Sequence, residues 1–391
     1  MAGVISRGIQ GPIIREGDDI VDIVVKSVYA SEQADGYTLQ NRDVIAVTES
    51  VVARAQGNYV TVDQVAQDIR AKFPAKKLGL VFPILSRNRF SMCLKAIARA
   101  MDEVVVLFSY PDDEVGNPLM VRSAYLKNRY SGVYDFEEAD FVKTFGSPVH
   151  PFTGVNYLDF YREVIESEGA KATFLFSNDC RYIASYCDSI LCCDIHTRNE
   201  TRDVLQSMGK QVLTLADIMN APVDGSGYHE AYGMLGSNKA IEEKLKLFPR
   251  NCQPVVEGIQ ARIKAERGLD VEVMVYGDGA FKDPVGGIWE LADPVVSPAY
   301  TAGLAGKPNE LKLKFLADND FADLSGEALQ EAIRQEIRAK REDLVGDMSS
   351  EGTTPRQYTD LLGSLCDLTS GSGDKGTPFI VIQNYFNNYA G

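Results

Sequence analysis

The stretch that decides the fold class is a strand, a helix and a second strand in succession: LGLVFPIL (78–85), FSMCLKAIA (90–98) and VVVLF (104–108). The first and last segments are short apolar runs, a pattern typical of buried strands. In the middle segment, apolar residues recur at positions i, i+3, i+4, i+7 and i+8 from Phe90, which predicts an amphipathic helix. The unit therefore predicts a sheet with helices packed against it.

Similar signals extend to both ends of the chain. Apolar runs at 44–47, 271–276 and 379–383 read as further buried strands. Because helices and strands alternate without a regular βαβ spacing, we predict an α+β fold with mixed α/β sheets instead of a strict dinucleotide-binding fold. The region 111–240 is denser in tyrosine and in loop signals, so we interpret it as an inserted α/β subdomain between core segments 1–110 and 241–391.

Length and charge narrow the possible functions. A chain of 391 residues is long enough for about two to three domains. Its 40 Lys and Arg against 55 Asp and Glu give a net charge of −15, which repels nucleic acid and anionic membranes. No apolar run approaches the roughly 18–20 residues of a membrane helix. We therefore expect neither nucleic acid nor membrane as a partner.

The cysteines and histidines indicate structural roles. An odd number of cysteines, seven, lies mostly within apolar runs, which predicts reduced thiols in the cytoplasm. Two adjacent cysteines on a strand cannot both face one metal site, so we interpret Cys192 and Cys193, near His196, as buried thiols. His150 and His229 lack partners nearby in sequence and are expected to be structural.

The strongest local signal for a binding site is the loop Ser370–Pro378. Its glycines alternate with small residues, so its backbone N–H groups can surround an anion, with Lys375 as a point charge. The order of loop then strand differs from a Walker A motif. A flexible connection before the last strand explains the composition equally well.

Three further polar clusters follow predicted strands. Asp278, in Gly277-Asp278-Gly279, has room for Mg²⁺ or Mn²⁺, although Asp-Gly is also a common turn. The segment Thr48–Gly57 places hydroxyl groups and Arg54 where a helix N-terminus can meet a phosphate, or it is an ordinary capped helix. The segment Ser86–Arg89 repeats this layout. Several such clusters at strand ends favour a site for a small phosphate.

Taken in order, these segments resemble the coenzyme F420-0:L-glutamate ligase family, also called the gamma-glutamyl ligase family. Gly11–Ile20 looks like its opening L-P-L-I-K-E-G-D-D-L, and Asp43–Gly57 is similar to its G-D-V-L-V-V…S-K-A-E-G segment. Val271–Asp278 resembles its V-x-I-x-D-T strand, and Gly371–Ile380 resembles its G-x-G-G-D-G-I-P-x-V stretch. The resemblance covers roughly residues 8–100 and 250–391.

The resemblance implies an enzyme with a mixed α/β core that forms homodimers. Such an enzyme uses GTP or ATP with Mg²⁺ or Mn²⁺ to join L-glutamate to a small-molecule carboxylate through an acyl phosphate. Lys375 and Arg54 are the implied catalytic residues, and Asp278 and Asp374 the implied metal ligands. The implied nucleotide contacts are Gly11, Pro12, Ile13, Ile14, Glu49, Ser50, Arg54, Asn88, Gly371, Gly373, Asp374, Lys375 and Gly376. The inserted region 111–240 is the expected acceptor region.

The chain departs from the family pattern in three places. The family's G-I-D-A-S-N motif has Ile84–Asn88 opposite it, without the aspartate, and Gly279 replaces the threonine after the metal-binding aspartate. The insertion of about 130 residues has no counterpart in the short members of the family. These departures leave a second hypothesis: a protein on the same fold that binds a nucleotide or metabolite without turnover. The acceptor, and the choice between GTP and ATP, stay open.

Overall fold

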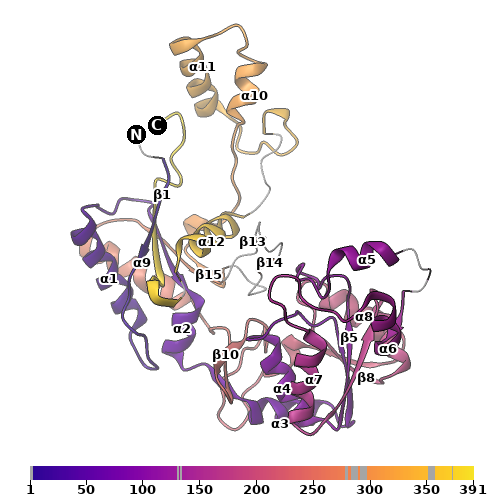
Figure 1. Ribbon diagram of the computed structural model, residues 1–391. Coiled ribbons are helices and arrows are strands. Elements are labelled where there is room, and N and C mark those ends of the chain that lie inside the picture. Colours follow the sequence, from indigo (N-terminus) through magenta and orange to yellow (C-terminus); the bar gives the residue numbers. More distant parts are fainter. Residues whose placement is uncertain are drawn as a thin grey trace.

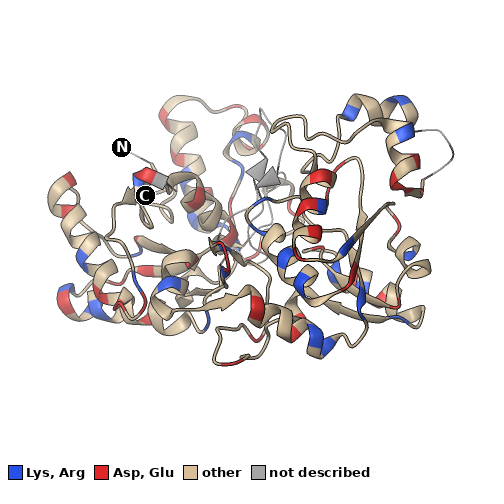
Figure 2. Ribbon diagram, turned by 60° about the horizontal axis from the view of Figure 1, so that its bottom comes forward, with Lys and Arg blue, Asp and Glu red and all other residues tan. Residues whose placement is uncertain are grey.

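The two largest sheets of the described residues divide the chain into a terminal lobe and an inserted lobe (Figure 1). The computed structural model describes residues 3–129, 132, 134–277, 297–350, 357–371 and 373–391, together with the backbone of two short paired strands, β13 (Phe281–Lys282) and β14 (Trp289–Glu290). Acidic and basic residues are distributed over both lobes (Figure 2). Among the described residues, no helix has the length and apolar character needed to cross a membrane.

The terminal lobe is built around a five-stranded sheet that joins the two ends of the chain. In spatial order its strands are β1 (Ile5–Ile9), β16 (Phe379–Gln383), β2 (Val44–Thr48), β12 (Glu272–Tyr276) and β15 (Ala299–Tyr300). Only β2 and β12 are parallel to each other, and the remaining neighbours are antiparallel. The mixed sheet confirms the predicted α+β class.

Helices cover both faces of this sheet, because alternate strand residues point to opposite sides. On one face, strand residues such as Ile45 and Val273 pack against α1 (Ile20–Asp35) and α9 (Gln253–Arg267). On the other face, Ala46 and its neighbours pack against α12 (Tyr358–Thr369). Helix α2 (Glu49–Gln56) follows β2 directly.

The ends of these helices follow capping rules. Asp19 caps α1 by accepting a hydrogen bond from the N–H of Asp22. Gly268 ends α9 in the left-handed conformation that glycine adopts readily. Thr354 and Pro355, a pair that can cap and begin a helix, lie outside the described residues.

The inserted lobe contains a six-stranded sheet. Its spatial order is β6 (Phe136–Glu137), β7 (Lys171–Phe176), β5 (Glu103–Phe108), β4 (Lys77–Val81), β8 (Ser189–Cys192) and β9 (Gln211–Thr214). All neighbours are parallel except β6, which is antiparallel to β7. The lobe's helical segments are α3 (Val62–Lys72), α4 (Phe90–Ala100), α5 (Arg122–Asn128), α6 (Glu138–Phe145), α7 (Tyr157–Ser167), η1 (Cys180–Ser185), α8 (Arg198–Ser207) and η2 (Leu215–Asp217).

The inserted lobe begins earlier than the boundary at residue 111 that we expected. Strands β4 and β5, assigned from the sequence to the core, lie in the six-stranded sheet. A buried strand has the same apolar pattern in either sheet, so the pattern alone does not reveal its neighbours. A small sheet of β3 (Tyr59–Thr61), β11 (Lys244–Lys246) and β10 (Asn238–Ile241) lies where the chain enters and leaves this lobe (Figure 1).

A helical hairpin stands away from both sheets (Figure 1). It consists of α10 (Leu313–Asp318) and α11 (Gly326–Ala339), preceded by η3 (Ala302–Leu304) and followed by η4 (Met348–Ser350). Leu316, Ile333 and Ile337 form its small core. The chain's C-terminal end reaches it, since Arg338 donates a hydrogen bond to the carbonyl oxygen of Ala390 at 2.9 Å.

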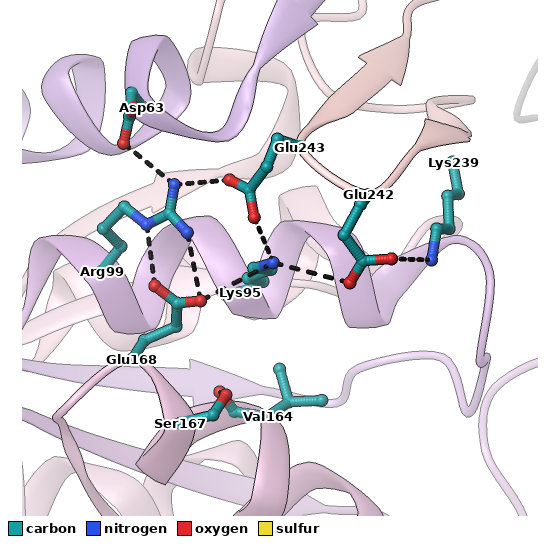
Figure 3. A network of polar contacts seen from close by, with 9 residues as sticks. All are labelled: Asp63, Lys95, Arg99, Val164, Ser167, Glu168, Lys239, Glu242 and Glu243. Atoms are coloured by element: carbon teal, nitrogen blue, oxygen red, sulfur yellow. Dashed lines mark hydrogen bonds and ion pairs between the residues drawn. The ribbon is translucent and has the colours of Figure 1, made fainter.

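A network of ion pairs fastens the β10–β11 hairpin to the inserted lobe (Figure 3). Arg99 on α4 donates to both carboxylate oxygens of Glu168, at 2.7 and 3.1 Å, and also to Glu243 and Asp63. Lys95, one turn earlier on α4, contacts the same Glu243. Because Arg99 and Glu168 are mostly buried, this network is better shielded from solvent than an ordinary surface ion pair.

Replacing Arg99 by methionine is expected to lower the free energy of unfolding by about 2 kcal/mol, since Glu168 loses a two-pronged partner in a poorly hydrated place. Urea unfolding followed by circular dichroism measures the change. Arg338→Met, at an exposed guanidinium on α11, is the control and is expected to change stability by less than about 1 kcal/mol. Equal losses in both variants would show that the network is no more stabilising than a surface contact.

The same network predicts that the free energy of unfolding falls in acid. Hydrogen bonds from Arg99 and Lys95 lower the pKa of Glu243 from 4.5 to about 2. The folded protein therefore binds this proton less readily than the unfolded chain, so the contribution is complete above about pH 4.5 and declines as the pH falls toward 2. Arg99→Met is expected to reduce this part of the pH dependence, because Lys95 still contacts Glu243, and urea unfolding between pH 2 and pH 5 measures the change.

Candidate active site

Three segments far apart in the sequence meet at one end of the five-stranded sheet. The N–H of Gly11 donates to the carbonyl oxygen of Gly376 at 3.1 Å, and the N–H of Thr48 donates to that of Pro378 at 3.0 Å. The side chain of Gln10 also contacts the carbonyl oxygen of Lys375, at 3.4 Å. The structure thus brings together the predicted opening loop, the end of β2 and the glycine-rich loop.

The end of β12 lies at the same edge. Strands β2 and β12 are parallel, with Thr48 opposite Tyr276 in register, so both chains leave the sheet on the same side. The predicted metal ligand Asp278 comes two residues after Tyr276 and lies outside the described residues. The other predicted metal ligand, Asp374, is an exposed residue of the glycine-rich loop.

The glycine-rich loop is held at its two ends. The N–H of Gly371 donates to the hydroxyl of Thr377 at 2.7 Å, and a short helical turn, η5 (Gly373–Lys375), lies between them. Asp374, Lys375 and Gly376 are exposed, and within the described part of the chain Lys375 makes no ion pair. The bond between Gly371 and Thr377 closes the loop, and the loop presents the Lys375 ammonium group and its own backbone to solvent.

Close packing explains the glycine at the meeting point. A Cβ atom at Gly11 would lie 2.7 Å from the ring of Phe379, closer than real Cβ contacts. Any larger residue at position 11 would push the opening loop away from the loop that contains Gly376. Gly376 itself has a φ of 61°, in the left-handed region that favours glycine.

Arg54 links the opening loop to α2. Its Nε donates to the carbonyl oxygen of Ile14 at 3.2 Å from the last turn of the helix. Ile14 is buried, whereas Pro12 and Ile13 are exposed, Ile13 to 80%. Arg54 therefore positions the loop through one nitrogen. Ser50, the second residue of α2, is half-buried near the helix N-terminus.

Glu49 has a partner that the sequence analysis missed. Glu49 and Lys246 are each only 4% exposed, and the Lys246 ammonium donates to both carboxylate oxygens at 2.7 and 2.8 Å. Lys246 belongs to β11, so the pair joins α2 of the terminal lobe to the small sheet. The signal was a lysine inside the apolar run Leu245–Phe248, because a buried lysine requires an anionic partner.

Asn88 lies in the other lobe, between β4 and α4. Its carbonyl oxygen accepts a hydrogen bond from the N–H of Lys239 at 2.9 Å, and its side chain accepts one from the hydroxyl of Ser86 at 3.1 Å. None of these contacts involves the glycine-rich loop. Its predicted role at the nucleotide stays a prediction.

The cysteines and histidines have the structural roles expected. None of the seven cysteines forms a disulfide, and all except the half-buried Cys180 are buried. His150 and His229 each accept backbone N–H bonds at Nδ1, and burial lowers the pKa of both imidazoles. Across the described ranges, no group of three or more His, Cys, Asp or Glu side chains is arranged to hold a metal ion.

Comparison with known proteins agrees with this architecture. The sequence model of one family, F420-0:Gamma-glutamyl ligase, matches residues 8–384, nearly the whole chain. The chain belongs to this family. The match spans both lobes, so the inserted lobe is part of the region that the family model covers.

Membership of the gamma-glutamyl ligase family confirms the resemblance seen in the sequence. It identifies the protein as an amide ligase of the kind that forms gamma-glutamyl bonds. A search of curated proteins finds no significant match.

Proposed function

We propose that the protein is a GTP- or ATP-dependent ligase that joins L-glutamate, or a similar amino acid, to a small-molecule carboxylate. The observation that carries the proposal is the convergence of Gly11, Thr48 and the loop Gly371–Gly376 at one sheet edge. A carboxylate is a poor electrophile, so an acyl phosphate is needed. The acceptor carboxylate attacks the γ-phosphorus and the nucleoside diphosphate leaves; the glutamate amine then attacks the acyl carbon and phosphate leaves.

The residues at this edge suit a phosphate chain. The exposed backbone and ammonium group at Asp374–Gly376 supply hydrogen-bond donors and one positive charge. The N-terminus of α2, at Glu49 and Ser50, adds a partial positive charge at the end of β2. A negatively charged protein can bind an anion here because these donors act locally.

Of the two predicted metal ligands, one lies among the described residues and the other outside them. Asp374 is an exposed carboxylate in the glycine-rich loop, and Asp278 follows the strand that ends beside Thr48. Carboxylates are the ligands that Mg²⁺ and Mn²⁺ prefer. When bound, the cation would offset charge on the phosphoryl oxygens.

We also propose that the enzyme acts in the cytoplasm as a homodimer. Light scattering of the purified protein would test the dimer.

The alternative is a protein that binds nucleotide or a metabolite without turnover. The observation that favours it is the segment Ile84–Asn88, which lacks the family aspartate and lies in the inserted lobe. The glycine-rich loop favours the ligase, because its exposed Lys375 ammonium group has no ion pair among the described residues and a scaffold has no need of such a group at this edge.

The first test is calorimetric titration of GTP, and then of ATP, into the full-length protein with and without Mn²⁺. We expect metal-dependent binding of one nucleotide, weakened at least about ten-fold by Asp278→Ala. Asp320→Ala, at an exposed residue of the helical hairpin, is the matched control and should bind like the wild type. If the folded protein binds neither nucleotide, the proposed ligase mechanism is wrong; binding without phosphate release, whatever carboxylate is supplied, would favour the scaffold.

A further inference from the structure

The first turn of α2 contains a carboxylate beside the place proposed for phosphate. Glu49 is the first residue of the helix and follows Thr48, whose N–H bonds to the glycine-rich loop at Pro378. Thr48 makes no side-chain hydrogen bond to this turn, so it does not cap the first N–H groups of α2. These N–H groups, together with the positive end of the helix dipole, attract any anion within reach. The acidic residue of the turn is Glu49 itself.

A carboxylate at this position has two opposite effects. It stabilises the helix, because its negative charge lies near the positive end of the dipole. It also repels a phosphate at the same N–H groups, since the two charges lie within about one Debye length, roughly 10 Å at 0.1 M salt. A carboxylate that is free to move can also bind the unsatisfied N–H groups in place of the phosphate. A phosphate site at this turn therefore requires the Glu49 carboxylate to be neutralised and held away.

Lys246 on β11 meets both requirements. Its ammonium group donates to both carboxylate oxygens of Glu49, at 2.7 and 2.8 Å, so the positive charge of the lysine offsets the negative charge of the glutamate. Both side chains are buried, where solvent screens charges least. Because both oxygens contact the same ammonium group, the carboxylate is directed toward β11 and held there.

The lysine is itself fixed by the small sheet at the junction of the lobes. Lys246 lies opposite Tyr59 of β3 in the antiparallel register. The N–H of the next residue, Leu247, donates to the carbonyl oxygen of Asn58 at 2.9 Å, and the Asn58 side chain donates to that of Phe248 at 2.7 Å. These bonds hold β11 against the segment that follows α2. The position of the ammonium group therefore does not depend on the glycine-rich loop.

The other end of α2 is anchored at the same junction. The side chain of Gln56, the last residue of the helix, exchanges two hydrogen bonds with the backbone of Arg250, at 2.5 and 2.9 Å. The N–H of Asn58 bonds to the carbonyl oxygen of Ala53 at 3.0 Å. Both ends of α2 are thus tied to the junction, where the helix lies next to the small sheet (Figure 1). A helix held at both ends presents its first N–H groups in a fixed direction, which lowers the entropic cost of binding an anion.

We propose that Lys246 is a positioning residue of the ligase: it holds and neutralises Glu49, so that the first turn of α2 accepts a nucleotide phosphate instead of the protein's own carboxylate. This role rests on the proposed function and extends it to a residue of the small sheet. Lys246 acts through Glu49 and does not itself touch the nucleotide. Its loss should therefore weaken nucleotide binding more than it slows the chemical step, the reverse of the effect expected for Lys375.

Calorimetric titration of GTP, and then of ATP, with Mn²⁺ tests this role on the full chain. We expect Lys246→Met to weaken binding of the nucleotide that the wild type binds by about ten-fold, because Lys246 no longer offsets or holds the Glu49 carboxylate. Glu49→Gln removes the competing charge and should bind this nucleotide at least as tightly as the wild type. The double variant, Glu49→Gln with Lys246→Met, should return the affinity to within about three-fold of the wild type.

Two further measurements separate positioning from a purely structural role. During turnover, Lys246→Met should raise KM for the nucleotide about ten-fold and change kcat by less than about three-fold. Asn58→Ala is the matched control, because it removes a buried hydrogen bond to Phe248 at the same junction and leaves the ion pair in place. It should lower the melting temperature and leave nucleotide affinity within about two-fold. If Lys246→Met does not fold, Lys246→Gln, which keeps a donor without the charge, replaces it with the same expected direction.

Two outcomes overturn the positioning role and leave the ligase function standing, because the wild type still binds nucleotide in both. Equally weak binding by Lys246→Met and by the double variant would mean that Lys246 acts through packing alone. Weaker binding by Glu49→Gln than by the wild type would mean that Glu49 itself contacts the nucleotide. If the wild type binds neither GTP nor ATP, the proposed function is wrong, and this role of Lys246 with it.

Discussion

Replacing Lys375 by methionine is expected to lower the rate of nucleotide turnover about a hundred-fold or more, with little effect on stability. Lys375 is exposed and makes no ion pair in the described part of the chain, so its removal leaves no buried charge without a partner. Its ammonium group is the only side-chain positive charge within the loop Ser370–Pro378. A charge that stabilises the transferring phosphoryl group acts mainly in the transition state, so kcat should fall more than KM rises.

The measurement is the initial rate of phosphate release with GTP, Mn²⁺, glutamate and a panel of carboxylates. Lys375→Arg keeps the charge and should retain more activity than the methionine variant. Lys143→Met, on α6 of the inserted lobe, controls for the loss of an exposed lysine. If Lys375→Met turns over GTP at the wild-type rate, the glycine-rich loop is a connection and not the phosphate site.

The sequence revealed the parts of this site but not all of their partners. Each part stands next to a strand, and the strand patterns at 44–47, 271–276 and 379–383 identified the segments that the sheet brings together. The bond between Gly11 and Gly376 joins residues at opposite ends of the chain. No local pattern predicts such a bond, and only the family resemblance associated the two segments.

The end of a strand was predictable from the sequence where a proline follows it. The apolar run 78–85 suggested one long strand, yet β4 ends at Val81. Phe82 has a φ of 51°, in the left-handed region, and Pro83 has no N–H to donate to a neighbouring strand. Pro83 was therefore the residue in the sequence that indicated the end of β4. The choice of sheet for β4 and β5 depends on distant pairing, which explains the misplaced lobe boundary.

Lys246→Met is expected to lower the free energy of unfolding by about 3–5 kcal/mol, the usual cost of removing one partner from a buried ion pair. Both oxygens of Glu49 accept hydrogen bonds from this ammonium group. Both residues are buried, so water does not replace these hydrogen bonds when the lysine is removed. The pair joins the start of α2 to β11, so its loss should also loosen the connection between the lobes.

A double variant separates the ion pair from simple loss of packing. Glu49→Gln with Lys246→Met leaves no buried charge from the pair, so it should recover a large part of the stability lost by Lys246→Met alone. Lys264→Met, at an exposed ion pair with Asp270 on the terminal lobe, should cost less than about 1 kcal/mol. Urea unfolding measures all of these variants. If the double variant is as unstable as the single one, Lys246 stabilises the junction through its methylene groups and not through its ion pair with Glu49.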